Sequence, residues 1–141
     1  MRLPLTLLAL AFAASCATAD KPMEPRSRAS CTTDPCVVKV IVRGCDNIRV
    51  EPEHLDIPAG KSSDIVWEIH QLPTMNFVFT RNGIEWKQGG GGGFSGAGGH
   101  GSVRYRWHNN NSGKGAHRYN VNVTQDMGRT ICVEDPTIFN H

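Results

Sequence analysis

The segment DIVWEIH, residues 64–70, decides the fold class, because apolar and polar side chains alternate along it. Ile65, Trp67 and Ile69 share one side, and a period of two is typical of a β-strand with one buried face. A helix would instead place its apolar residues three and four positions apart. The segment therefore predicts a strand whose buried face carries a tryptophan.

The same alternation recurs on both sides of this strand. Further strands are predicted around residues 38–42, 48–50, 55–57, 76–80, 84–86, 102–107, 118–124 and 130–133. Arg81-Asn82-Gly83 is expected to be a turn, and 102–124 is expected to be a hairpin that turns at 109–115. No amphipathic helical stretch and no internal repeat is found. About seven short strands with polar turns predict an all-β protein with a single Greek-key β-sandwich.

The first 19 residues have the pattern of a bacterial signal peptide. Arg2 precedes an apolar run over residues 3–14, which is too short to span a bilayer, and Ala17-Thr18-Ala19 matches a small-x-small cleavage site. Cleavage there predicts a secreted or periplasmic protein. Residues 20–30 mix charges, prolines and serine, and are expected to form a flexible leader to a domain at 31–141.

A second processing route leads to a different location. Ala13-Ala14-Ser15-Cys16 resembles a bacterial lipobox, so the alternative is a lipid-anchored envelope protein acylated at Cys16. This anchor would be the only membrane contact that the sequence suggests. The formal net charge of +2 gives no basis for nucleic-acid binding, which usually requires a strongly basic stripe.

Four cysteines remain after either cleavage, and an even number in an exported chain predicts two disulfides. Four cysteines allow three pairings; we expect Cys31 to pair with Cys36 around the Thr-Asp-Pro turn, and Cys45 to pair with Cys132 across the domain. A thiolate metal site is the alternative, but the chain contains no C-x2-C pair.

A glycine-rich run, GGGGGFSGAGGHG, occupies residues 89–101. A phosphate-binding loop would need a helix or a Lys-Ser/Thr pair after the glycines, whereas a predicted strand follows here. We therefore expect a long flexible loop with freely exchanging amides, anchored by Phe94. The alternative is a lid or contact surface.

A family resemblance is carried by two segments. IRVEPEHLDIPAGKSSDIVWEIH, residues 48–70, resembles the opening of cupredoxin domains, in which a Pro/Ala/Gly turn leads into a strand with a tryptophan. YRWHNNNSGKGAHRYNVNV, followed by DPTIFN, is similar to the end of small uncharacterised bacterial exported proteins of this kind. The resemblance covers roughly residues 37–140 and implies a cupredoxin-like sandwich.

The chain departs from that family at the copper site. A type 1 centre needs a Cys, two His and usually a Met, with the Cys, one His and the Met on the loop before the last strand, and residues 107–119 contain no cysteine. We therefore expect no type 1 copper and no cofactor. The alternative is copper or zinc bound by imidazoles alone, for which the candidate ligands are His70, His108 and His117.

No catalytic set is found in the sequence. There is no G-x-S-x-G motif, and the carboxylates near residues 51–56 are typical of a solvated loop. Arg104, Arg106 and Arg118 are expected to share the outer face of the 102–124 hairpin and to form a modest cationic strip. Such a strip is typical of a solvated strand face; the alternative is a contact for an acidic partner or a surface glycan. The sequence thus predicts a non-catalytic exported binding or structural module, whose partner is an unknown envelope protein or small ligand.

Overall fold

The computed structural model describes residues 26–44, 47–87, 89–125 and 135–141. Every regular element in these ranges is a β-strand, which confirms the all-β prediction. The described residues form ten strands, more than the seven or so expected, since short edge strands carry little hydrophobic alternation. Within the described part of the chain, no helix is long and apolar enough to cross a membrane.

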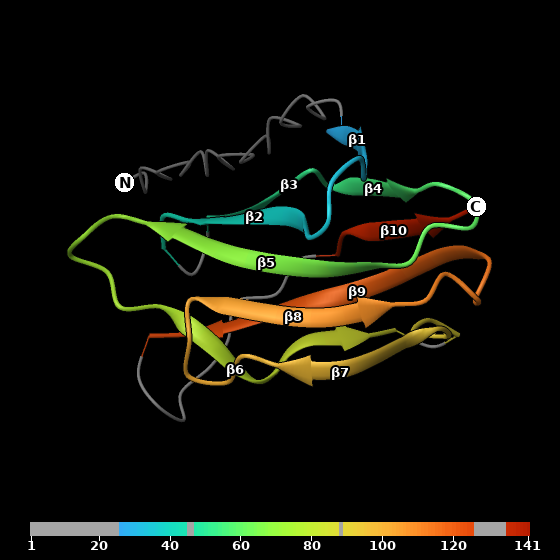
Figure 1. Cartoon of the computed structure of the whole chain (residues 1–141). Coiled ribbons are helices and arrows are strands. Elements are labelled where there is room, and N and C mark those ends of the chain that lie inside the picture. Colours follow the sequence, from blue (N-terminus) through green and yellow to red (C-terminus); the bar gives the residue numbers. More distant parts are fainter. Residues whose placement is uncertain (1–25, 45–46, 88, 126–134) are drawn as a thin grey trace, which may run out of the picture.

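The strands form two five-stranded sheets, which do not close into a barrel (Figure 1). The first sheet has the order β1-β4-β10-β9-β6, with β1 at Arg28–Ser30, β4 at His54–Ile57, β10 at Thr137–Asn140, β9 at Gly115–Thr124 and β6 at Val78–Trp86. The second has the order β3-β2-β5-β8-β7, with β3 at Ile48–Glu51, β2 at Cys36–Val42, β5 at Ser63–Gln71, β8 at Arg104–Asn109 and β7 at Phe94–Gly98.

The core lies between the two sheets, and both sheets contribute to one hydrophobic cluster. Strand β5 alternates as predicted, with Ile65 and Trp67 fully buried. Strand β9 brings Tyr119, Val121 and Val123 to the same core from the other sheet. Full burial of such side chains stabilises the fold by roughly 1.5–3 kcal/mol each, so period-two burial is the main determinant of the architecture.

Three expectations about the strands are wrong. Residues 102–124 do not form a hairpin, because β8 pairs with β5 and β7 while β9 pairs with β6 and β10. Residues 81–83 are not a turn but an irregular part of β6, whose register with β9 shifts between Phe79 and Ile84. Residues 28–30 belong to β1, which pairs in parallel with β4, so this part of the expected leader is a strand.

The glycine-rich run is also only in part a loop. Its middle forms β7, an edge strand that pairs antiparallel with β8. Sequence patterns could not find this strand, because glycines have no side chains that alternate between a buried and an exposed face. The run therefore builds one margin of the second sheet, beside β6 of the first (Figure 1).

The predicted disulfide between Cys31 and Cys36 is present, with 5.5 Å between the two Cα atoms. It closes the turn that leads into β2 and is buried beside Ser63. Cys16, Cys45 and Cys132, the predicted signal peptide at 1–19 and the predicted strand at 130–133 lie outside the described residues.

Candidate ligand-binding cleft

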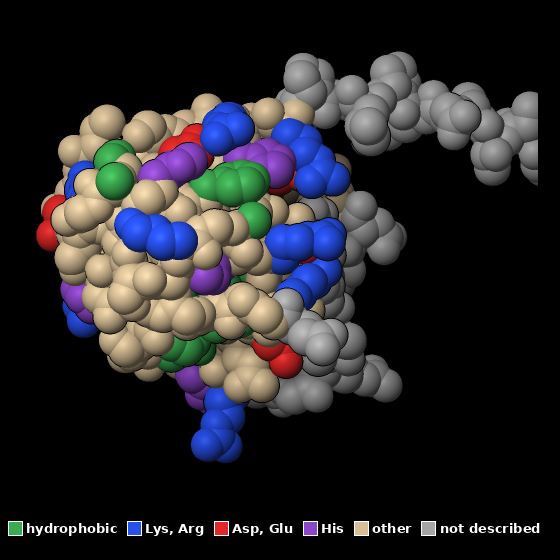
Figure 2. Space-filling model, turned by 90° about the vertical axis from the view of Figure 1, so that its right-hand side faces the viewer, with side chains coloured by type: hydrophobic (Ala, Val, Ile, Leu, Met, Phe, Trp, Pro, Cys, Tyr) green, Lys and Arg blue, Asp and Glu red, His purple; other side chains and the backbone are tan. Residues whose placement is uncertain are grey.

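The three candidate metal ligands are not brought together. His108 lies opposite Asp64 in the β5–β8 pair, whereas His70 is six residues further along β5, which is about 20 Å for an extended strand. His117 is on β9, in the other sheet. Among the described side chains, no group of three or more His, Cys, Asp or Glu could hold a metal ion. Figure 2 accordingly shows histidines scattered over the face it presents.

His117 instead fixes the glycine-rich run. It is buried, as expected from sharing a side with Tyr119, and its Nδ1 accepts a hydrogen bond of 3.2 Å from the Gly91 amide. The neutral ring therefore carries its proton on Nε2, which lies 2.7 Å from the Gly113 carbonyl oxygen and donates to it. This histidine holds two loops together, and both of its nitrogens are already occupied.

His108 belongs to a row of three hydrogen-bonded side chains, Ser62, His108 and Asp64, which the sequence analysis did not identify. His108 Nδ1 lies 2.8 Å from Asp64 Oδ1, and its Nε2 lies 3.2 Å from Ser62 Oγ. The connectivity is that of a nucleophile, a base and an orienting carboxylate. The row lies on an exposed outer face, however, and Arg106 also contacts the Asp64 carboxylate at 3.3 Å. It is part of a polar ladder along the β5–β8 pair.

The expected cationic strip does not form as one surface. Arg104 pairs with Glu68 at 2.8 Å within this ladder, whereas Arg118 lies on β9 in the other sheet and pairs with Asp135. Each arginine has a carboxylate partner, which largely neutralises its charge. Surface pairs of this kind contribute little to stability, at about 0–1 kcal/mol each.

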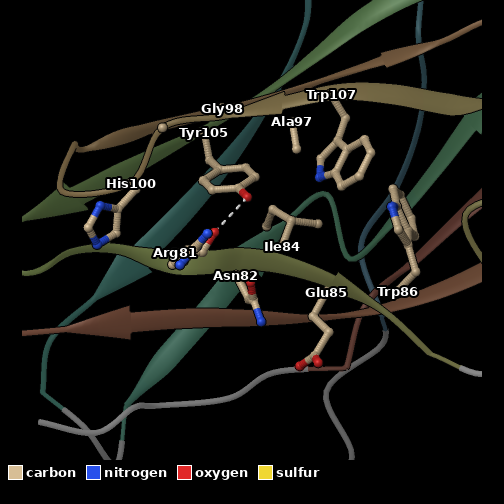
Figure 3. A pocket seen from close by; sticks show the side chains of 11 residues that line it. Arg81, Asn82, Ile84, Glu85, Trp86, Ala97, Gly98, His100, Tyr105 and Trp107 are labelled. Carbon is tan, nitrogen blue, oxygen red and sulfur yellow. Dashed lines mark hydrogen bonds between the residues drawn. The ribbon is translucent and has the colours of Figure 1, made fainter. Parts of the chain in front are cut away.

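A cleft of about 580 Å³ opens between the margins of the two sheets. This volume lies within the range of roughly 300–1,000 Å³ that is usual for small-ligand sites. Strand β6 provides one wall, and strands β7 and β8, with the turn between them, provide the other. The lining residues shown in Figure 3 are Arg81, Asn82, Ile84, Glu85, Trp86, Ala97, Gly98, Gly99, His100, Tyr105 and Trp107.

One end of the cleft is aromatic. The rings of Trp86 and Trp107 meet edge to face, with centroids 5.8 Å apart, and Trp86 also packs against the tilted ring of Phe94, with centroids 4.1 Å apart. Figure 3 shows both indole nitrogens on the sides of their rings that face Ile84. Among the described side chains, these two nitrogens are buried without a hydrogen-bond acceptor.

The other end and the rim are polar. Figure 3 shows Arg81 and His100 near each other at the end remote from the two tryptophans. Glu85 lies on the rim, where Asn122 donates to its carboxylate at 3.4 Å. The lining thus contains one permanent positive charge and one negative charge, and has no net charge when His100 is neutral.

The floor of the cleft depends on one glycine. A Cβ atom on Gly83 would lie 2.6 Å from the Tyr105 ring, so only glycine permits this close approach. The Tyr105 hydroxyl then donates to the Arg81 carbonyl oxygen at 3.1 Å and joins β8 to β6 across the gap. The interpretation of 81–83 as a turn concealed this role, and an Asn-Gly pair gives no hint of a partner in another sheet.

Comparison with known proteins adds no assignment. No protein-family model matches the chain, and no curated protein sequence matches it significantly. The function must therefore be inferred from the residues of the cleft.

Proposed function

We propose that this protein is an exported, non-catalytic binding module that holds a small ligand in the cleft between β6 and β7–β8. The observation that carries the proposal is the cleft of about 580 Å³, at whose aromatic end the buried indole N–H groups of Trp86 and Trp107 have no acceptor among the described residues. Buried polar groups in native proteins are nearly always hydrogen-bonded. Two exceptions at one end of the cleft, among the described residues, support a binding site there.

The energetic argument for a binding site is the cost of leaving a buried hydrogen-bond donor without an acceptor. A buried donor without a partner costs about 1–3 kcal/mol. Both nitrogens are inaccessible in this structure, so a ligand oxygen recovers that cost only when the indole rings turn toward the cleft. The third tryptophan shows the satisfied case, since Trp67 Nε1 donates to Tyr119 at 3.1 Å. Trp67 lies in the core, whereas the two unsatisfied indoles line the cleft.

The finer family assignment is part of this proposal. A Greek-key, cupredoxin-like fold is supported by the two-sheet architecture and by the turn at 58–60, which leads into the strand that carries Trp67. Export is supported by the predicted signal peptide and by the Cys31–Cys36 disulfide, since disulfides persist in oxidising compartments. Histidine-based copper or zinc binding has no cluster in its favour among the described residues.

The test follows the indole N–H resonances of ¹⁵N-labelled protein. The three resonances are assigned with single Trp→Phe variants. Mixtures of neutral sugars, sugar acids, dipeptides and aryl carboxylates are then added to the wild type at millimolar concentration. We expect at least one class to shift the Trp86 and Trp107 resonances while Trp67 stays unchanged. If no class shifts either resonance, or if all three move together as in unfolding, the proposal is wrong.

A further inference from the structure

We propose that protonation of His117 controls access to the aromatic end of the cleft. The neutral ring of His117 holds the backbone of Gly91 against Trp86, and the protonated ring releases it. This inference rests on the proposed function, because it concerns the regulation of the same site. It is argued from the hydrogen bonds of His117, the packing of Gly91 and the groups around the imidazole ring.

The two nitrogens of His117 have different partners, and only one of the two bonds depends on protonation. Nδ1 accepts a hydrogen bond of 3.2 Å from the Gly91 amide, whereas Nε2 donates to the Gly113 carbonyl oxygen at 2.7 Å. An imidazolium donates from both nitrogens, so a proton on Nδ1 would leave the Gly91 N–H facing another N–H. The bond from Nε2 is kept in both states. Protonation therefore removes an anchor of the glycine-rich run while the ring stays fixed to the turn before β9.

The backbone of Gly91 lies against the indole of Trp86. A Cβ atom on Gly91 would lie 2.8 Å from Trp86 Cδ1, the ring carbon that is bonded to the indole nitrogen. That nitrogen is buried and has no acceptor among the described residues. When Gly91 moves away, the indole gains room to turn its N–H toward the cleft. Release of Gly91 thus supplies the movement that binding at the aromatic end requires.

The glycine-rich run, rather than β9, is the part that can move. His117 belongs to β9, which is paired on both sides within its sheet. The other described hydrogen bonds of Gly90 and Gly91 are local. The Gly90 amide donates to the Lys87 carbonyl oxygen at 2.8 Å, and the Phe94 amide donates to the Gly91 carbonyl oxygen at 3.1 Å. Glycine gains more backbone freedom on release than any other residue, so loss of the His117 bond favours an opened run.

The groups around the ring do not stabilise a buried imidazolium. Among the described residues, the side chains that contact the His117 ring are Trp86 from β6, Phe94 from β7 and Asn140 from β10, and none of these titrates. The charged residues next to them in the chain have partners of their own: Lys87 and Arg118 contact Asp135, Glu85 accepts from Asn122, and Lys114 donates to the His141 carbonyl oxygen. A buried charge without a partner is costly, and water that enters the opened run lowers that cost. Protonation and opening therefore favour each other.

The first experiment follows ¹⁵N-labelled protein from about pH 7.5 to pH 5, the interval in which histidines usually titrate. The ring nitrogen shifts report the protonation of His117. We expect the protection factor of the Gly91 amide to fall about tenfold with the same midpoint, as is reasonable for one lost hydrogen bond, and the Trp86 indole resonance to shift with it. The Trp67 indole in the core should stay unchanged. The proposal is wrong if His117 stays neutral at pH 5, if Gly91 keeps its protection when His117 is protonated, or if the Trp67 indole moves together with the Trp86 indole.

Two variants show whether His117 is the titrating group. The amide of His117→Gln can accept from Gly91 and donate to Gly113 but does not titrate, so we expect this variant to lose the pH response of Gly91 and Trp86. His108→Gln, at an exposed histidine on β8, is the matched control and should keep that response. A response that survives in His117→Gln would assign the titration to another group and overturn the proposal.

The last experiment separates this control from the binding function itself. The neutral sugars, sugar acids, dipeptides and aryl carboxylates of the binding test are added at both pH values. We expect the class that shifts the cleft indoles to bind about tenfold more tightly at pH 5 than at pH 7.5 in the wild type, and equally at both in His117→Gln. Equal affinity at both pH values in the wild type would overturn control by His117 and leave the binding function standing. If Gly91 responds to pH but no class shifts the cleft indoles at either value, the binding function is wrong and the release of Gly91 stands.

Discussion

The indole of Trp67 and the hydroxyl of Tyr119 form a hydrogen bond of 3.1 Å across the centre of the molecule. Trp67 is on β5 and Tyr119 is on β9, so the bond joins the two sheets. Both side chains are fully buried, and their rings meet edge to face with centroids 5.5 Å apart. One contact thus satisfies the only polar atoms that these two residues bring into the core.

Replacing Tyr119 with phenylalanine tests this bond. We expect Tyr119→Phe to lower the free energy of unfolding by about 1–3 kcal/mol, because it leaves the Trp67 N–H buried without an acceptor. Urea unfolding followed by circular dichroism measures the change. The matched control is Tyr105→Phe, whose hydroxyl donates to a carbonyl near the open cleft, where water can replace it. An equal loss in the two variants would contradict the special role of the core bond.

The core could be predicted from the sequence, whereas the cleft could not. Alternation places Ile65, Trp67 and Tyr119 inward because hydrophobic burial acts on each strand locally. The cleft is formed by the margins of two different sheets, and its position depends on which strands are at the edges. Nothing in the local pattern of β6 shows that Gly83 lies against Tyr105, since their contact joins distant parts of the chain.

A methyl group at position 83 should distort the cleft floor. Its Cβ would lie 2.6 Å from the Tyr105 ring and 2.9 Å from Phe79 Cβ. We expect Gly83→Ala to destabilise the protein by about 1–3 kcal/mol through overpacking, and to shift the Trp107 indole resonance. Gly98→Ala is the matched control, since its new Cβ would have open space around it. Unfolding curves of the two variants that superimpose would show that the close approach is unimportant.

The His117 side chain should control the order of the glycine-rich run. We expect His117→Ala to destabilise the protein by about 2–3 kcal/mol, from two lost hydrogen bonds and a small cavity. Amide exchange at Gly91, whose N–H donates to Nδ1, should be slow in the wild type and fast in the variant. His70→Ala, at an exposed position, provides the control. Fast exchange at Gly91 in the wild type would favour the flexible loop that the composition suggests.

Stability should fall in acid through Asp56. Its carboxylate accepts from Arg28 Nε at 2.5 Å and lies 2.8 Å from His141 Nε2, and these contacts, Arg28 foremost, lower its pKa to about 2. In the unfolded chain the value is about 3.9, so the folded state binds the proton more weakly. The contribution is therefore fully present above about pH 4 and is lost as the pH falls towards 2.

Urea midpoints measured between pH 5 and pH 2 follow this loss. We expect Asp56→Asn to flatten the curve across that interval, because the variant has no carboxylate to protonate at this position. Glu51→Gln, at a half-buried side chain beside Arg49, is the comparison. If the urea midpoint falls with pH equally steeply in Asp56→Asn and in the wild type, the contacts of Asp56 with Arg28 and His141 do not determine the loss of stability in acid.

The row of Ser62, His108 and Asp64 gives the sharpest test of a non-catalytic function. Its two hydrogen bonds have the connectivity of a serine hydrolase, but the His108 side chain is 43% exposed and Arg106 competes for the Asp64 carboxylate. Catalysis would also require donors for the developing oxyanion, which are worth about 10²–10³ in rate. We expect 4-nitrophenyl acetate hydrolysis by the wild type, Ser62→Ala and His108→Ala to agree within about twofold. A wild-type rate tenfold above that of Ser62→Ala, with an acylated serine detected by mass spectrometry, would replace the binding module with an esterase.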